Sequence, residues 1–473
     1  MPDAEREKAP EAALYQTDTI VAPATAPGMG AVAIVRLSGA QAIAIGRRLW
    51  HPLRSRRFDS RRLYLGEIRD PQTDVPIDHA LAVFMAGPAT LTGEDICELH
   101  CHGGPFIVRR IVGLALAQGA RMAERGEFSR RAFLNGRLDL TAAEAVADLV
   151  AAHSDAALSQ ALAHLNGALR QRIEGLRSQF ISIRAHLEAE IDFSDEELAL
   201  PSRTALAQAV EALRVEVAEL HDSFSRGRLM REGARAAIIG RPNSGKSSVL
   251  NLLLGVERAI VTAIAGTTRD LIEDTLSLEP YALVIIDTAG LRHSADEVER
   301  IGIERARAQA RDADLLIAVF DAAQPLAAED QEVIELCRGR PGVALLNKSD
   351  LPLVLAAADL AARGLTMPVV AISALRGEGA GQLRSCLRDA VAALQDSGGG
   401  PGQIAISRQR HRQALGLALD GLATARDNLR AGLPPEIVAV DLTQAVDALG
   451  AICGEVSSED VLDAIFREFC IGK

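Results

Sequence analysis

A run of eight residues near the middle of the chain has the composition and spacing of a phosphate-binding loop. It reads Gly240-Arg-Pro-Asn-Ser-Gly-Lys246-Ser247 and matches the pattern G-x-x-x-x-G-K-[ST]. An apolar run precedes it and a helical pattern follows it, which is the context that the motif requires. Glycine lets backbone amides wrap phosphate groups, Lys246 would neutralise the β- and γ-phosphates, and Ser247 would offer a hydroxyl to Mg²⁺.

Two further motifs predict which base the nucleotide carries. Asn347-Lys-Ser-Asp350 ends an apolar run, and Ser373-Ala374 follows the next one. The carboxylate of Asp350 can accept paired hydrogen bonds from the ring NH and the amino group of guanine, whereas adenine offers no such pair. Ser373 and Ala374 would close the base pocket. The sequence therefore predicts GTP rather than ATP.

An acidic turn and a threonine pair complete the expected magnesium site. Asp287-Thr-Ala-Gly290 would place a carboxylate near Mg²⁺ and a glycine near the γ-phosphate, and Thr267 or Thr268 would supply a further ligand. Ligands at the carboxyl ends of parallel strands are the expected geometry. The predicted nucleotide-binding residues are Asn243, Ser244, Gly245, Lys246, Ser247, Ser248, Thr262, Ala263, Ile264, Ala265, Gly266, Thr267, Thr268, Asp287, Thr288, Ala289, Gly290, Asn347, Lys348, Asp350, Ser373 and Ala374.

One position lacks a group that hydrolysis needs. Signalling GTPases carry a glutamine after the Asp-x-x-Gly turn to orient the attacking water, but this chain has Leu291 there. Either the domain hydrolyses slowly as a switch, or another residue takes that role. Glu299 is the nearest substitute, although spacing alone favours a solvated glutamate at a helix start. Arg269 is a weak candidate for an arginine finger, and a monovalent cation held by Asn243 could supply the same charge.

The bulk composition limits the class of protein. The chain has 473 residues, enough for about two to four domains. Hydrophobic residues make up 48% and charged residues 24%, which is typical of a globular protein. The net charge of −12 argues against a general polyanion-coating protein. The polar first residues do not resemble a secretory signal, no apolar stretch is long enough to span a bilayer, and six scattered cysteines favour a reducing cytoplasm.

The pattern of hydrophobic residues divides the chain into segments that predict different kinds of secondary structure. Residues 18–134 predict an α+β unit. Alanine and leucine recur at helical spacing from Thr141 to Phe224, and only Pro201 is expected to interrupt these helices. From 234 to 394, apolar runs alternate with helical segments, the pattern of a parallel α/β sheet. After a Gly-rich linker the chain returns to helices, so an α/β domain inserted into a helical domain is the simplest architecture. The elements expected in the first unit are strands at Asp18–Val21, Val32–Leu37, Leu81–Met85 and Ile96–His100 and a helix at Ile107–Gln118.

The motifs together resemble one family. From Asp18 to Lys473 the chain is similar to the bacterial tRNA-modification GTPases called MnmE or TrmE. The most specific segments are GRPNSGKSS, TAIAGTTRD, IDTAGLR with DEVERIGIERA, RGEFSRRAFLNGRLDLTAAEA and the terminal CIGK. Residues 1–17 form a polar tail that precedes the family's usual start.

The resemblance implies a multidomain α+β and α/β fold with three parts. These are a folate-binding-like domain at 18–134, a helical domain split between 135–230 and 395–473, and an inserted Ras-like P-loop GTPase domain at 233–394. It implies a cytoplasmic homodimer that forms a heterotetramer with the flavoprotein MnmG (GidA), and FAD belongs to that partner.

The same resemblance implies an activity. The two proteins would add an aminomethyl-type (carboxymethylaminomethyl) group to C5 of the wobble uridine of certain tRNAs. The one-carbon unit would come from a 5-formyl or methylene form of tetrahydrofolate. GTP hydrolysis would be activated when two GTPase domains meet across K⁺.

The resemblance also assigns residues. Glu299 becomes the water-orienting residue, against the preference from spacing. The K⁺ ligands would be Asn243, Thr262, Ile264 and Thr267, and the Mg²⁺ ligands would be Ser247 and Thr268. The folate-binding residues would be Arg36, Glu98, Arg137 and Lys473. Arg137 stands where the family often has lysine, which keeps the charge but changes the hydrogen-bond geometry.

Cys470 and three local clusters have two interpretations each. Cys470 could be a nucleophile that adds to the uracil ring, or a small apolar residue packed under the terminal helix. The cluster Cys97, His100, Cys101 and His102 does not have a familiar zinc spacing and favours strand and turn. Basic clusters are often solvated faces, but the implied tRNA makes the second of two a candidate RNA contact. The first cluster comprises Arg54, Arg56, Arg57, Arg61 and Arg62, and the second comprises Arg408, Arg410 and Arg412.

Two rival functions stay open on the sequence alone. One is a GTPase of RNA or ribosome assembly, although such proteins carry an RNA-binding module or a second GTPase domain. The other is a non-catalytic scaffold controlled by GTP, which Leu291 permits. Dependence of hydrolysis on K⁺ would distinguish both from the main hypothesis.

Overall fold

A computed structural model of the protein describes residues 18–54, 59–192, 201–256, 274–286, 310–395, 404–455 and 458–473. Contacts divide these residues into two units. The first contains the residues up to 147 together with 453–473, and the second contains the described residues from 148 to 452. None of the described helices is both long enough and apolar enough to cross a membrane.

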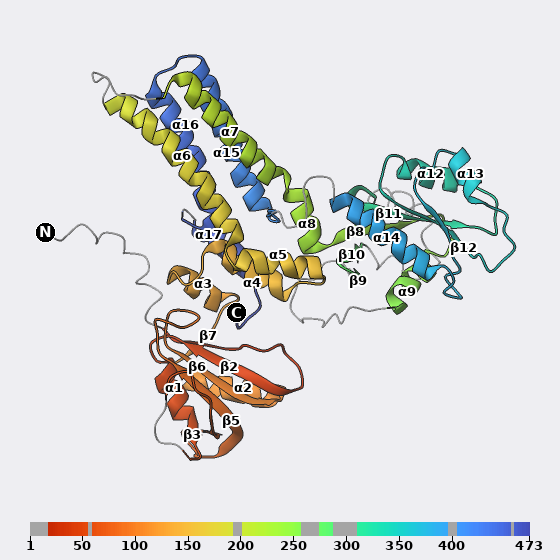
Figure 1. The fold of residues 1–473 in the computed structure, drawn as a ribbon. Helices are drawn as coiled ribbons and strands as arrows, with labels where there is room; N and C mark the ends of the chain where they lie inside the picture. The colour runs from red at the N-terminus through yellow and green to blue at the C-terminus, as the bar shows by residue number, and fades with distance from the viewer. Residues whose placement is uncertain are drawn as a thin grey trace. The chain divides into compact units, whose positions relative to one another are not determined.

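A seven-stranded sheet forms the centre of the first unit (Figure 1). Its neighbouring strands run antiparallel except for one parallel pair between the first and last strands. In spatial order the strands are β3 (Trp50–Pro52), β4 (Tyr64–Arg69), β5 (Pro76–Met85), β6 (Ile96–Gly103), β2 (Gly30–Ser38), β1 (Ile20–Pro23) and β7 (Arg121–Met122).

Strand alternation gives this sheet two different faces. Val35 on β2 and Leu99 on β6 belong to one buried cluster with the helices α1 (Ala42–Leu49) and α2 (Pro105–Ala117). Their neighbours Arg36 and Glu98 are cross-strand partners and therefore lie on the opposite face. One face is thus an apolar core, and the other carries two of the predicted site residues.

The expected elements of this unit are confirmed with shifted ends. The helix predicted at Ile107–Gln118 begins at Pro105, and the strand predicted at Leu81–Met85 begins at Pro76. The strands β3, β4 and β7 were not predicted, because they are short or carry charges along one side. Three helices complete the unit: α3 (Glu127–Leu134), the first part of α4 (Leu140–Val150) and α17 (Glu459–Arg467).

Helices dominate the part of the second unit that flanks the α/β domain. They are α5 (Asp155–Leu165), α6 (Ala168–Asp192), α7 (Arg203–Asp222), α8 (Phe224–Glu232), α15 (Gln409–Arg430) and α16 (Pro435–Cys453). The prediction that only Pro201 interrupts the first helical stretch is wrong. Ser154 caps α5 by accepting a hydrogen bond from the amide of Ala157, and Gly167 adopts a left-handed φ of 86° between α5 and α6.

A six-stranded sheet forms the α/β domain. Its order is β13 (Val369–Ala371), β12 (Gly342–Asn347), β11 (Leu315–Asp321), β8 (Ala234–Ile239), β10 (Tyr281–Ile285) and β9 (Asp274–Leu278). Five strands are parallel, as predicted, but β9 is an antiparallel edge strand joined to β10 by a tight turn. The described helices of this domain are α9 (Lys246–Val256), α12 (Ala328–Cys337), α13 (Ala357–Ala362) and α14 (Ala380–Gln395), and buried apolar clusters pack on both faces of the sheet.

Candidate functional site

The phosphate loop connects the end of β8 to the start of α9. Asn243 and Gly245 both adopt left-handed backbone angles, with φ of 62° and 96°. Asparagine and glycine are the residues that tolerate this region best, which explains their places in the loop. The amides at the start of α9, from Lys246 onward, lack intrahelical acceptors and therefore form an anion-binding end.

Lys246 folds back over the loop that precedes it. Its Nζ donates hydrogen bonds to the carbonyl oxygens of Gly240, at 2.9 Å, and Arg241, at 2.8 Å. Burial lowers the pKa of Lys246 below its ordinary value. An ammonium held only by neutral carbonyls is suited to exchange them for phosphate oxygens, whose negative charge would stabilise it.

Asn347 connects the phosphate loop to the predicted base pocket. Its Nδ2 donates to the carbonyl of Ser244 at 2.9 Å, and its Oδ1 accepts from the amide of Ala374 at 3.1 Å. The side chain lies at the end of β12 and is only 2% exposed. A Cβ at Gly245 would collide with Nδ2 of Asn347, so the glycine of the motif is required by this contact. The structure thus brings three separate predicted segments together.

The group predicted to select guanine is held in its ionised form. Ser373 Oγ donates a hydrogen bond of 2.7 Å to Oδ1 of Asp350, and this bond lowers the pKa of that carboxyl. The amide of Arg376 in turn donates to Ser373 Oγ at 3.2 Å. An ionised, oriented carboxylate accepts two hydrogen bonds side by side, which is what guanine requires.

Asp321 is a site residue that the sequence reasoning missed. It ends β11, and its Oδ2 lies 2.6 Å from Nζ of Lys348, which itself has a left-handed φ of 65°. The ion pair fixes the lysine between Asn347 and Asp350. The available signal was an acidic residue at the end of a buried strand next to the nucleotide motifs.

Several predicted residues lie outside the described ranges. They are Thr262, Ala263, Ile264, Ala265, Gly266, Thr267, Thr268, Asp287, Thr288, Ala289, Gly290 and Glu299, together with Leu291 and Arg269. Of the predicted metal ligands, the structure describes Asn243 and Ser247, whose amide and hydroxyl oxygens are hard donors suited to K⁺ and Mg²⁺. Within the described ranges no group of three or more His, Cys, Asp or Glu is placed to hold a metal ion.

The open face of the first sheet gathers three of the four predicted folate residues. Arg36 Nε lies 2.7 Å from Glu98 Oε1, and Arg36 Nη1 approaches the carbonyl of Gly472 at 3.5 Å. Burial lowers the pKa of the adjacent Lys473, and the charge of Arg36 adds to this effect. The site therefore combines two cations and one carboxylate beside the Phe128 ring, which lies 5.6 Å from the guanidinium carbon of Arg36. This donor set fits a pterin with acidic substituents.

Arg137 and Cys470 lie in the same unit. Arg137 is exposed, and its stem lies beside Gly93 rather than in contact with the other three predicted folate residues. Cys470 is partly buried, and its carbonyl accepts from the amides of Gly126, at 3.4 Å, and Lys473, at 3.3 Å. The nucleophilic and packing interpretations of Cys470 therefore both stay open.

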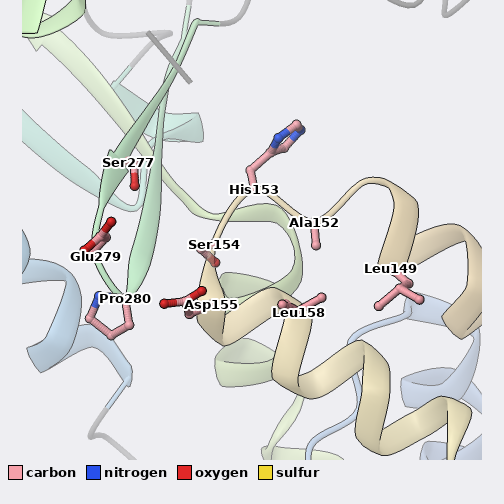
Figure 2. A pocket seen from close by; sticks show the side chains of 9 residues that line it. All are labelled: Leu149, Ala152, His153, Ser154, Asp155, Leu158, Ser277, Glu279 and Pro280. Carbon is pink, nitrogen blue, oxygen red and sulfur yellow. The ribbon is translucent and has the colours of Figure 1, made fainter. Parts of the chain in front are cut away.

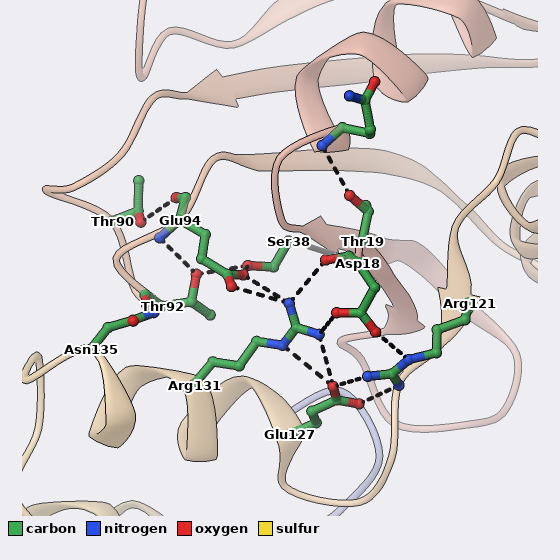
Figure 3. A network of polar contacts seen from close by, with 11 residues as sticks. Asp18, Thr19, Ser38, Thr90, Thr92, Glu94, Arg121, Glu127, Arg131 and Asn135 are labelled. Atoms are coloured by element: carbon green, nitrogen blue, oxygen red, sulfur yellow. Dashed lines mark hydrogen bonds and ion pairs between the residues drawn. The ribbon is translucent and has the colours of Figure 1, made fainter. Parts of the chain in front are cut away.

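A buried arginine supports this region and was not predicted (Figure 3). Arg131 is 2% exposed and contacts the carboxylates of Asp18 at 2.7 Å, Glu127 at 2.9 Å and Glu94 at 3.1 Å. These groups come from the segment just before β1, from α3 and from the loop before β6. The same helix α3 carries Phe128, so the network positions the aromatic neighbour of Arg36.

The two basic clusters differ in how exposed their arginines are and in how many internal contacts these arginines make. Arg408 is buried and lies 2.7 Å from Asp148, and Arg410 donates to the carbonyls of Ala451 and Ile452. Arg412 stacks on Phe224. Arg408 and Arg410 are thus engaged in internal contacts, which argues against a predicted RNA contact at these two residues, whereas Arg412 is exposed. Of the first cluster, Arg54, Arg61 and Arg62 are exposed, and Arg56 and Arg57 lie outside the described residues.

The cysteine and histidine cluster belongs to β6. Cys97 and Cys101 point into the sheet core, where burial raises the pKa of both thiols, while His100 and His102 alternate onto the other face. His102 Nδ1 lies 2.7 Å from Asp78. Strand alternation therefore separates the side chains that the motif had placed together.

A polar cavity of about 290 Å³ lies where α5 begins (Figure 2). Strand β9 contributes Ser277 and the β9–β10 turn contributes Glu279 and Pro280. The carbonyl of Pro280 accepts a hydrogen bond of 3.2 Å from the amide of Ala156. No predicted nucleotide residue lines this cavity. It joins the edge of the α/β sheet to the helical part of the same unit.

Comparison with known proteins agrees with this arrangement. A family model described as the MnmE helical domain matches residues 140–470, and one described as the GTP-binding protein TrmE N-terminus matches residues 19–137. The tRNA modification GTPase MnmE of Symbiobacterium thermophilum is 44% identical over 460 residues, covering 96% of this chain and 99% of that protein. MnmE of Syntrophotalea carbinolica is 43% identical over 461 residues, covering 97% and 100%. The chain therefore belongs to the MnmE (TrmE) family of tRNA modification GTPases.

Proposed function

We propose that this protein is a K⁺-assisted GTPase that acts in tRNA modification. With the flavoprotein MnmG (GidA) it would add a carboxymethylaminomethyl-type group to C5 of the wobble uridine, using a tetrahydrofolate one-carbon unit. The observation that carries the GTPase part is the bridge made by Asn347 between Ser244 and Ala374, with Asp350 oriented beside it. The full-length match to relatives named tRNA modification GTPases supports the substrate.

Different residues of this chain would have different roles in GTP hydrolysis. Asp350 selects guanine, and Lys246 neutralises the β- and γ-phosphates. Mg²⁺ would be held by Ser247 and Thr268, and it would stabilise the charge that develops on the phosphates. K⁺ would be held by Asn243 with Thr262, Ile264 and Thr267, and it would supply the positive charge of an arginine finger. Glu299 would orient the attacking water in place of the glutamine that Leu291 replaces.

The first unit supports the one-carbon part of the proposal. Arg36 and Lys473 would bind acidic or carbonyl groups of the folate, and Glu98 would accept hydrogen bonds from its amino-pterin ring. Arg137 would contact the same ligand from the loop after α3. Cys470 would add to uracil only if the RNA reaches it. The working assembly would be a cytoplasmic homodimer joined to MnmG.

Deletion of the gene tests the substrate. Nucleosides from digested tRNA of the deletion strain should lack the C5-modified wobble uridine, and a plasmid copy should restore it. Mass spectrometry measures both. An unchanged nucleoside profile would contradict the proposed function.

Two measurements test the hydrolytic mechanism. Hydrolysis should be faster in KCl than in NaCl at equal ionic strength, and a rate indifferent to K⁺ would favour a GTP-controlled scaffold. Glu299→Ala should keep GTP binding but slow turnover by more than about tenfold, roughly 1.4 kcal/mol of barrier. Near-normal turnover would return Glu299 to a solvated surface position.

A further inference from the structure

The helical layer of the first unit carries positive charge only. Helix α1 reads AIAIGRRL and α2 reads PFIVRRIVGLALA, so the two helices contain four arginines and no acidic residue. The chain as a whole has a net charge of −12. A uniformly basic layer on an acidic protein indicates a local partner of negative charge rather than general solubility.

These arginines lie on the outer side of the layer. Ile45 and Leu49 of α1 and Ile111 of α2 belong to the core under the helices. Arg48 and Arg109 are both exposed on the opposite sides of their helices. The layer therefore presents its charges to solvent.

Two of the four arginines form no ion pair with a residue in the described part of the chain. Arg109 donates only to the carbonyl of Pro105, at 3.3 Å, and Arg48 makes no ion pair with a described residue. The other two are engaged, since Arg110 pairs with Asp70 at 3.0 Å and Arg47 stacks on Phe84. Arg48 and Arg109 are thus the charges available to a ligand.

An exposed aromatic ring accompanies these charges. Phe106 is 73% exposed in the first turn of α2, and it is the one phenylalanine of the described residues among the exposed large hydrophobic side chains. Arg109 follows it by three residues, so both side chains lie on one side of the helix. Phe106 is thus an exposed ring one helical turn from Arg109, and Arg48 lies on the neighbouring helix α1. A ring accompanied by arginines is the combination that binds an unstacked base and its phosphate.

We propose that the surface formed by Arg48, Phe106 and Arg109, here called the α1–α2 face, binds the RNA strand of the tRNA substrate. Arg48 and Arg109 would contact phosphates, and Phe106 would stack on an unpaired base. The inference rests on the proposed function, since that supplies the RNA. It also places the RNA contact away from Arg408 and Arg410, which already contact Asp148 and the carbonyl of Ala451.

Charge removal tests the phosphate contacts. The double variant Arg48→Gln/Arg109→Gln should bind fluorescein-labelled bulk tRNA about tenfold more weakly in anisotropy titrations of the full chain. The slope of log K against log salt should fall by about 1.4 to 1.8, because two phosphate contacts are lost. The control Arg388→Gln/Arg430→Gln removes the same charge from exposed arginines of α14 and α15 and should bind like the parent. Equal loss in both pairs would overturn the inference.

Removal of the ring tests stacking. Phe106→Ala should weaken binding about tenfold with an unchanged salt slope, and Phe106→Trp should restore it. Thermal melting of each variant checks that the fold is retained. Parental affinity in Phe106→Ala, or displacement of tRNA by an equal concentration of polyglutamate, would overturn the inference in favour of an acidic protein partner.

The outcomes separate this inference from the proposed function. A parent chain that binds tRNA while the double variant binds equally well defeats only the α1–α2 face. Unchanged modified nucleosides in the deletion strain defeat the proposed function, whatever the variants do.

Discussion

Gly245 and Asn347 lie in direct contact although 102 positions separate them in the sequence. The amide of Asn347 occupies the space where any other residue at position 245 would carry its Cβ, and it donates to the carbonyl of Ser244. The phosphate loop and the guanine motif are therefore one packed unit. Disturbing either residue should affect phosphate and base recognition together.

Gly245→Ala should abolish tight GTP binding. The new methyl group collides with Asn347, and alanine is also strained at a φ of 96°. We expect affinity for a fluorescent GTP analogue to fall at least about hundredfold, or about 2.7 kcal/mol. Gly255→Ala is the control, because it lies in α9 with open space around it. That change should leave affinity unaltered, and near-parental binding by Gly245→Ala would show that the contact is dispensable.

Asp350→Asn should change the preferred base. Xanthine presents one donor and one acceptor where guanine presents two donors, so an asparagine amide matches xanthine better. Competition with GTP and XTP should show weaker GTP binding and stronger XTP binding. Ser373→Ala only frees the carboxylate, so it should weaken GTP binding without creating a preference for XTP. An unchanged order of preference in Asp350→Asn would remove Asp350 from the base pocket.

GTP binding should be accompanied by proton uptake at alkaline pH. Burial lowers the pKa of Lys246 in the free protein, and bound phosphates would raise it again. The uptake should appear between that lowered pKa and the ordinary value of 10.5. Calorimetry in buffers of different ionisation enthalpy measures it. Lys246→Arg should abolish the uptake, since arginine stays charged throughout.

Arg131→Met should destabilise the first unit strongly. The change leaves the carboxylates of Asp18, Glu94 and Glu127 without their shared cation, which costs about 3–5 kcal/mol when a buried charge loses its partner. Arg62→Met removes an exposed ion pair with Asp59 and an exposed contact with the Tyr64 ring, and it should cost about 0–1 kcal/mol. Denaturant unfolding of both variants gives the comparison. A similar loss in the two would mean that the network does not hold this unit together.

The same network predicts a dependence on pH. Burial raises the pKa values of Asp18 and Glu127, but hydrogen bonds from Arg121 and Arg131 outweigh it, and both values end below normal. Such carboxylates stabilise the fold fully above their unfolded pKa values near 4, and the stabilisation is lost as the pH falls through the folded values. The parent should lose stability steeply below about pH 4. Arg131→Met should show a flatter curve there.

Local motifs were predictable because their chemistry depends on consecutive residues. The sequence indicated Lys246, Asn347 and Asp350, and the structure brings their segments together. Asp321 and Arg131 were missed because their partners are distant in the chain, and no spacing rule connects them. The roles of Glu299 and the K⁺ ligands stay predictions.

Periodicity alone also misjudged some boundaries and surfaces. Apolar residues continue at helical spacing across the breaks before α5 and α6, and only the cap of Ser154 and the turn at Gly167 mark them. The sequence predicts a basic surface cluster at Arg408 and Arg410, but in the structure Arg408 pairs with an acidic side chain and Arg410 donates to helix-end carbonyls. Such contacts depend on which helices are neighbours, which a single sequence does not specify.

The last residues of the chain pack into the first unit, which otherwise consists of the described residues up to 147. Helix α17 and Phe469 supply half of the apolar cluster around Leu140 and Ala143, and Gly472 packs on the carbonyl of Pro23. During synthesis the ribosome must add more than 300 residues after position 147 before it has made α17 and Phe469. At 5–20 residues per second this takes roughly 15–60 s. The residues of the first unit are therefore made first, but its apolar cluster around Leu140 cannot be completed until the end of the chain has been synthesised.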